Sequence, residues 1–80
     1  MNNTSGEIID REILTDLVLL GKKHDVLLYL HNSTISKDDN NIAYAALKIA
    51  ASRNDKAMIL ILRKFFVNVD ENIVKSIYTD

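Results

Sequence analysis

The fold of this chain is decided by residues 42–66, which are IAYAALKIAASRNDKAMILILRKFF. Apolar and small residues recur at helical spacing before Arg53-Asn54-Asp55, and a five-residue apolar run, Met58 to Leu62, follows it. Asn54 can adopt a positive φ and Asp55 can cap a helix, so these polar residues predict a tight turn. The stretch therefore predicts a hairpin of two helices, at about 37–52 and 56–66.

The residues before this hairpin predict another one. A helix over about 7–20 is indicated by apolar residues at steps of four, four and three: Ile9, Ile13, Leu17 and Leu20. Gly21 is well placed to end that helix in the left-handed conformation. Asp25 then opens a short second helix that runs through Leu30.

The ends of the chain complete the organisation. Residues 1–6 are polar and are expected to be disordered, with Thr4 and Glu7 at capping-box spacing for the first helix. A last helix is expected at about 71–78, after the capping residue Asp70. We expect one helical-hairpin domain over 7–80.

The two hairpins align when the chain is shifted so that Gly21 falls on Asn54. The same shift places Val26 on Ile59, so that both turns fall at matching positions. Helix–turn–helix units with a period of about 33–34 residues are typical of ankyrin and tetratricopeptide repeats. The predicted fold class is all-α, with two stacked helix–turn–helix hairpins and a C-terminal helix.

The composition argues against several classes of function. The 80 residues carry a net charge of -1, which lacks the basic excess of nucleic-acid-binding domains. There is no Cys for a disulfide framework or a thiolate metal site, and no apolar run approaches the roughly 20 residues that span a bilayer. A chain this short gains little net stability from burial alone, so a protein partner or a second copy is the default expectation.

No catalytic constellation is visible. His24 and His31 lie two helical turns apart without further metal ligands, and Asp38-Asp39 fits the first turn of a helix better than a catalytic pair. Lys22-Lys23-His24 is interpreted as a solvated loop. We expect a protein that is not an enzyme, with no cofactor, no metal, no nucleic acid and no membrane contact.

The helix at 56–66 is apolar almost all round, and such a helix is normally buried on every side. One interpretation is that the neighbouring helices surround it. The other is that part of its surface, with Leu60, Phe65 or Phe66, forms a groove for another helix.

Three stretches resemble a known family. Residues 13–24, with Asp16, the run Leu17 to Leu20, Gly21 and His24, look like the opening helix of the small tetratricopeptide-like needle chaperones of bacterial type III secretion systems. Tyr29-Leu30-His31 resembles the family's aromatic-Leu-His step, and Ala45 to Asp55 resembles its small-residue helix and turn. The resemblance covers about residues 12–66; the Trp-containing helical unit of longer members is absent.

The resemblance implies a cytosolic bacterial chaperone. It would hold the amphipathic helix of a self-polymerising needle subunit on its concave side, with a small helical co-chaperone on its outer helices. The residues expected in the groove are Tyr29, Tyr44, Leu47, Leu60, Ile61, Phe65 and Phe66. The residues expected to bind the co-chaperone are Ile9, Ile13, Leu17 and Leu20.

Two alternatives stay open. One is a degenerate ankyrin-like adaptor, with ankyrin-like spacing at Leu47, Ala50, Ala51, Asn54, Met58, Ile59 and Leu62. Against it, the Thr-Pro-Leu-His start is missing and two uncapped repeats are rarely stable alone. The other is a small helical regulatory protein that forms a homodimer.

Overall fold

The chain is entirely helical over the residues that the structure describes. A computed structural model describes the backbone of residues 3–79 and the side chains of residues 9–77. These residues form five helices and no strand: α1 (Asn3–Leu19), α2 (Lys23–Asn32), α3 (Asn40–Ser52), α4 (Lys56–Phe65) and α5 (Glu71–Thr79). The predicted all-α fold class is confirmed.

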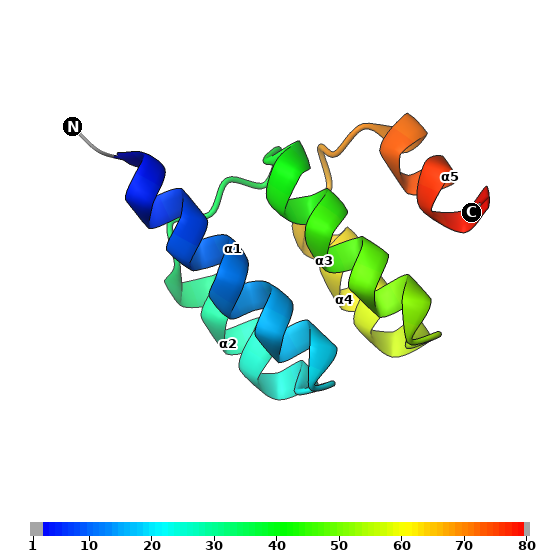
Figure 1. The fold of residues 1–80 in the computed structure, drawn as a ribbon, viewed down its shortest axis with the longest axis horizontal. Helices are drawn as coiled ribbons and strands as arrows, with labels where there is room; N and C mark the ends of the chain where they lie inside the picture. Colours follow the sequence, from blue (N-terminus) through cyan, green and yellow to red (C-terminus); the bar gives the residue numbers. More distant parts are fainter. Residues whose placement is uncertain (1–2, 80) are drawn as a thin grey trace.

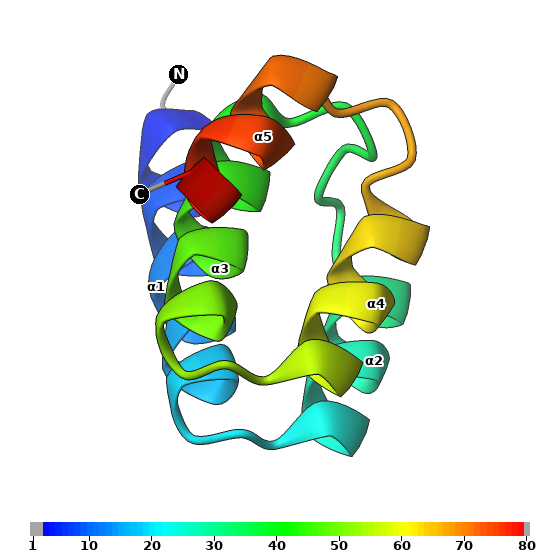
Figure 2. The same cartoon turned by 90° about the vertical axis from the view of Figure 1, so that its right-hand side faces the viewer.

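The helices form two layers (Figures 1 and 2). In one layer α1, α3 and α5 lie side by side, and in the other α2 lies beside α4. Each hairpin crosses between the layers, because α1 packs on α2 and α3 packs on α4. The described residues thus form a stack of two hairpins followed by α5, which packs against α3. Within residues 3–79, α4 therefore has a neighbour in its own layer on one side only.

The turn of the first hairpin recurs in the second. The backbone hydrogen bonds that end α1 return in the same register at the end of α3: Gly21 N to Val18 O and Asn54 N to Ala51 O, Lys22 N to Leu17 O and Asp55 N to Ala50 O. This is the Schellman arrangement, which requires a left-handed residue after the helix. Gly21 (φ 73°) and Asn54 (φ 56°) supply that residue, as their types predict.

The core lies between the two layers. Its small members are on α3, where the side chains of Ala43, Ala46 and Ala50 are fully buried. Small side chains let neighbouring helices approach closely, and α3 is the helix that packs against α1, α4 and α5. The larger fully buried side chains come from α1, α2, α3, α4 and the residue after α4: Leu14, Val18, Val26, Leu47, Met58, Leu62 and Phe66.

Some helix starts differ from the sequence prediction. The helix expected from residue 37 begins at Asn40, because the Asp39 carboxylate accepts the Ile42 N–H at 3.1 Å and caps α3 there. In the chain before it, the Ser36 hydroxyl donates to the Asp38 carboxylate. The helix expected from Asp25 begins earlier, at Lys23, and extends to Asn32.

The N-terminal prediction also needs correction. The segment 1–6 was expected to be disordered, whereas α1 begins at Asn3. Thr4 therefore lies inside the helix and is not its N-cap residue. Residues 1 and 2 lie outside the described residues.

Replacing Gly21 with Ala tests the turn. A Cβ at Gly21 would meet the Arg53 guanidinium at 3.4 Å, an ordinary contact, so the cost comes from the positive φ. We expect Gly21→Ala to lower the free energy of unfolding by about 1–2 kcal/mol in urea titrations followed by circular dichroism. The matched variant Asn54→Gly relieves the same constraint in the second turn and is expected to keep wild-type stability. An equally stable Gly21→Ala variant would contradict the turn geometry.

Candidate interaction surface

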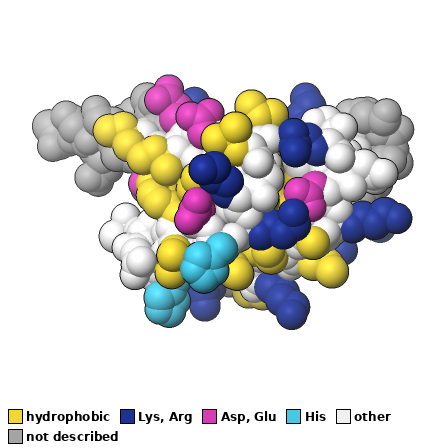
Figure 3. Space-filling view, turned by 90° about the horizontal axis from the view of Figure 1, so that it is seen from below, with side chains coloured by type: hydrophobic (Ala, Val, Ile, Leu, Met, Phe, Trp, Pro, Cys, Tyr) yellow, Lys and Arg dark blue, Asp and Glu magenta, His cyan; other side chains and the backbone are white. Residues whose placement is uncertain are grey.

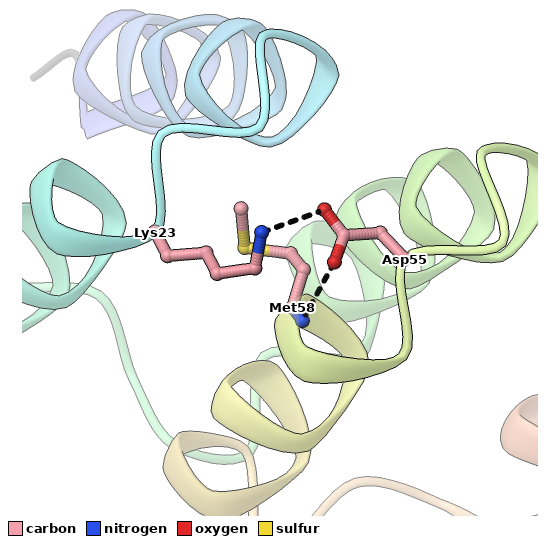
Figure 4. Close-up of polar contacts among 3 residues, drawn as sticks. All are labelled: Lys23, Asp55 and Met58. Atoms are coloured by element: carbon pink, nitrogen blue, oxygen red, sulfur yellow. Dashed lines mark hydrogen bonds and ion pairs between the residues drawn. The ribbon is translucent and has the colours of Figure 1, made fainter.

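The two hairpin turns are joined by one carboxylate. Asp55 caps α4 by accepting the Met58 N–H on Oδ1 at 3.2 Å, and its Oδ2 accepts a hydrogen bond from Lys23 Nζ at 3.3 Å. Figure 4 shows Lys23 reaching from the start of α2 to this carboxylate. Lys23, expected in a solvated loop, is therefore a link between the first hairpin and the second.

The environment of Asp55 favours its charged form. The Met58 N–H, and to a lesser degree the Lys23 ammonium, hold the pKa of the Asp55 carboxyl below its ordinary value. A second polar link lies at the other end of α2, where the Tyr29 hydroxyl donates to Asp10 Oδ1 of α1 at 2.5 Å. Partial burial, together with this carboxylate, raises the pKa of Tyr29 to about 12.

The open side of α4 borders a groove, called the α4 groove below. Its volume is about 690 Å³, and its walls come from α4, the end of α3, the turn between them and α5. The lining residues are Ala51, Asn54, Lys56, Ile59, Leu60, Arg63 and Ile77. A shallower hollow of about 330 Å³ continues past Leu60 and Arg63 towards Val67 and Glu71.

The α4 groove combines apolar surface with positive charge. The Leu60 side chain is 61% exposed, whereas its neighbour Ile59 is only 8% exposed. Lys56 and Arg63 supply the charge, and no carboxylate is among the lining residues. Arg63 also meets Glu71 at 3.6 Å in an exposed ion pair. This arrangement suits an apolar helix face with acidic flanks.

A second cleft, of about 380 Å³, lies between α2 and α4. Leu27, Leu30 and His31 line it from α2, and Ile61, Lys64 and Phe65 line it from α4, with Lys37 at the edge. The Ile61 and Phe65 side chains pack partly against the core. The cleft is therefore a seam between two packed helices, with Leu27 exposed at its mouth.

The structure distributes the expected groove residues over several places. Leu60 lies in the α4 groove, and Ile61 and Phe65 lie in the cleft between α2 and α4. Tyr29 is bonded to α1, and Tyr44 on α3 is exposed beside Lys48, whose Nζ is 5.6 Å from the ring centre. These residues do not form one concave surface.

Two expected groove residues belong to the core instead. Leu47 is 2% exposed and Phe66 is 1% exposed, so neither offers a surface to a partner. Both are apolar residues in predicted helices, but the sequence could not show that the neighbouring helices cover them. Sequence reasoning also missed Lys56, Ile59, Arg63 and Ile77 as groove residues, since only the packing of α5 brings Ile77 near α4.

The residues expected to bind a co-chaperone lie on α1 and directly after it. Ile9 and Ile13 on α1 and Leu20 after its end are exposed, while Leu17 is half-buried against the core. In Figure 3, a band of hydrophobic side chains lies towards the N-terminal side, and further hydrophobic side chains lie among Lys and Arg side chains over the rest of this face. Both ends of the stack therefore expose apolar side chains, such as Ile9 and Ile13 at one end and Leu60 at the other.

His24 and His31 are exposed, and no group of three or more possible metal ligands occurs among the described residues. None of the helices within residues 3–79 is both long and apolar enough to cross a membrane. Comparisons with protein-family models, curated proteins and solved structures found no match to this chain.

The acid stability of the domain tests the role of Asp55. Its folded-state pKa is lowered, so its contribution to the free energy of unfolding is present above the unfolded-state pKa and is lost as pH falls through the folded-state pKa. We expect Asp55→Asn to lose stability less steeply than the wild type between neutral pH and about pH 2. Lys23→Met, which leaves the Met58 hydrogen bond intact, should fall between them. Identical acid dependence of all three chains would refute this role.

Phenolate absorbance tests the link between Tyr29 and Asp10. The raised pKa means that folding favours the neutral phenol, a contribution present below the unfolded-state pKa of about 10 and lost as pH rises to about 12. We expect a titration component near pH 12 that disappears in Tyr29→Phe and moves to lower pH in Asp10→Asn. Circular dichroism at each pH would establish that the chain is still folded. A wild-type curve without this component would be inconsistent with the contact.

Proposed function

We propose that this domain is a protein-binding module without catalytic activity, which holds an amphipathic helix of a partner in the α4 groove. The observation that carries the proposal is Leu60, a large apolar side chain that is 61% exposed on the open side of α4. It lines the α4 groove together with the buried Ile59 and two cations, Lys56 and Arg63. A helix with an apolar stripe and acidic flanks would cover Leu60 and neutralise the groove.

The finer proposal is a bacterial cytosolic chaperone for a type III secretion needle subunit. Its support is the resemblance of residues 12–66 to the needle chaperones, together with two exposed apolar regions at different ends of the stack. The α4 groove would hold the amphipathic helix of the needle subunit. The exposed Ile9 and Ile13 on α1, with Leu20 directly after it, would bind the small co-chaperone. Covering the apolar helix face of a self-polymerising subunit blocks the head-to-tail contact that extends a filament.

The second candidate is an ankyrin-like adaptor. It is favoured by the turns, whose hydrogen bonds recur in one register, and by the arrangement of first helices in one layer and second helices in the other. The two candidates share the α4 groove and differ in the partner. An adaptor would leave needle polymerisation unchanged. A chaperone would depend on its co-chaperone and suppress that polymerisation.

Replacing Leu60 tests whether the α4 groove binds the partner. Because Leu60 is exposed, Leu60→Asp should change the free energy of unfolding by no more than about 0.5 kcal/mol. Loss of its apolar contact should weaken binding of a needle subunit by about tenfold or more. Binding would be measured by calorimetry with the co-chaperone present, and function by light scattering from polymerising needle subunit.

The matched control is Leu28→Asp on α2. Leu28 is 48% exposed but lines none of the three hollows described above, so this variant should bind and suppress polymerisation like the wild type. Equal loss of binding in both variants, or no loss in Leu60→Asp, would count against the α4 groove. Failure of the wild type to affect polymerisation, with helix binding retained, would favour the adaptor.

A further inference from the structure

The contact between α2 and α4 indicates which kind of helix fits against the open side of α4. The shift that places Gly21 on Asn54 also places Lys23 on Lys56, which therefore holds the same position in the second hairpin. Lys23 meets the carboxylate of Asp55, the residue that caps the next helix in its layer. Lys56 lies in the α4 groove and forms no ion pair among the described residues. Lys56 thus repeats the position of Lys23, but among the described residues no capping carboxylate of a following helix lies beside it.

The apolar surface follows the same register. Leu27 of α2 borders α4 in the cleft that Ile61 and Phe65 also line. Its counterpart in the second hairpin is Leu60, which faces the open α4 groove. The edge of the contact between α2 and α4 is therefore repeated on α4, beside which no further second-layer helix lies within residues 3–79.

We propose that the α4 groove binds a partner helix with an acidic N-cap, docked parallel to α4 in the way that α4 is docked on α2. The cap carboxylate lies against Lys56. Apolar residues at the third, sixth and tenth positions after the cap face the groove, as Met58, Ile61 and Phe65 follow Asp55. This inference rests on the proposed function and adds the orientation of the bound helix and the residue that sets it.

Electrostatics explains why the cap must be acidic. A helix N-terminus carries a partial positive charge, so it approaches a lysine favourably only with an anion between them. Asp55 plays this part between Lys23 and the start of α4, as Figure 4 shows. Arg63, further along the α4 groove, already meets Glu71. Lys56 is left to receive the cap of the incoming helix.

The probe is a peptide built from the chain's own α4. It has the sequence of residues 54–67 with Arg63→Glu and Lys64→Glu, which give it acidic flanks to match the α4 groove. A second peptide also carries Asp55→Ser, which keeps a capping side chain and removes its charge. Each peptide is titrated into the full wild-type chain and into Lys56→Met, which forms a double-mutant cycle.

We expect each single change to weaken binding about threefold, and the two changes together to weaken it no further, because they remove the same ion pair. Lys48→Met is the matched control, since Lys48 lies beside Tyr44 on α3 and outside the α4 groove. Binding to this variant should equal wild-type binding. Independent effects of the peptide and protein changes would overturn the assignment of Lys56.

A spin label reports the orientation. The chain has no Cys, so one Cys added to either end of the peptide carries the only label. A label at the N-terminus should broaden the amide signals of residues 54–57, and a label at the C-terminus those of residues 63–67. The reverse pattern would overturn parallel docking.

Other results separate this inference from the proposed function. Binding of a full-length partner that depends on Leu60 but not on Lys56 would overturn the inference and leave the proposed function intact. Loss of partner binding in Lys56→Met but not in Leu60→Asp would contradict both. A concentration-dependent dimer of the wild type that is lost in Leu60→Asp would put a second copy in the α4 groove and overturn the partner helix.

Discussion

The structure depends on the contact between the two hairpin turns, which passes through the carboxylate of Asp55. One oxygen of that group caps α4 and the other binds Lys23, so the start of one helix is fixed relative to the preceding hairpin. Gly21 and Asn54 make this possible, because their positive φ angles end α1 and α3 tightly enough to bring the turns together. The remaining packing follows: α1 meets α3, and α2 meets α4.

A stack of this kind leaves uncovered apolar surface at its ends. Each hairpin buries its apolar side against the neighbouring hairpin. The last second-layer helix has no following helix among the described residues, so its outer apolar side stays uncovered. In this chain that helix is α4, and α5 covers α3 but leaves Leu60 exposed. The exposed apolar side of α4 is thus a consequence of the repeat architecture. Its positive charge, from Lys56 and Arg63, is a property of this particular sequence.

The sequence was informative where a residue type has a local conformational role. The turns at Gly21 and Asn54, the Asp55 cap and the common register of the two hairpins followed from glycine, asparagine and aspartate chemistry, and the structure confirms them. Helix starts were less certain. Asp38 and Asp39 are both capping types, and only the hydrogen bond to Ile42 shows that Asp39 is the cap.

The candidate site was harder to predict because exposure depends on packing partners. Within the apolar run of α4, periodicity gave no means to separate Leu60, which is exposed, from Leu62, which is fully buried. Phe66 was expected at a surface and lies in the core, since it follows the end of α4 and turns inward. Lys56 and Arg63 lie two turns apart on α4, and the groove beside them was missed because its other wall, with Ile77, comes from α5.

We propose that the open side of α4 is the binding surface. Methyl NMR of the labelled chain with and without its helical partner tests it most directly. The methyl signals of Ile59, Leu60 and Ile77 should shift together, while those of Leu28 stay in place, because Leu28 lies outside the α4 groove. Shifts confined to Leu28, or to Ile9, Ile13 and Leu20 on and directly after α1, would contradict the proposal.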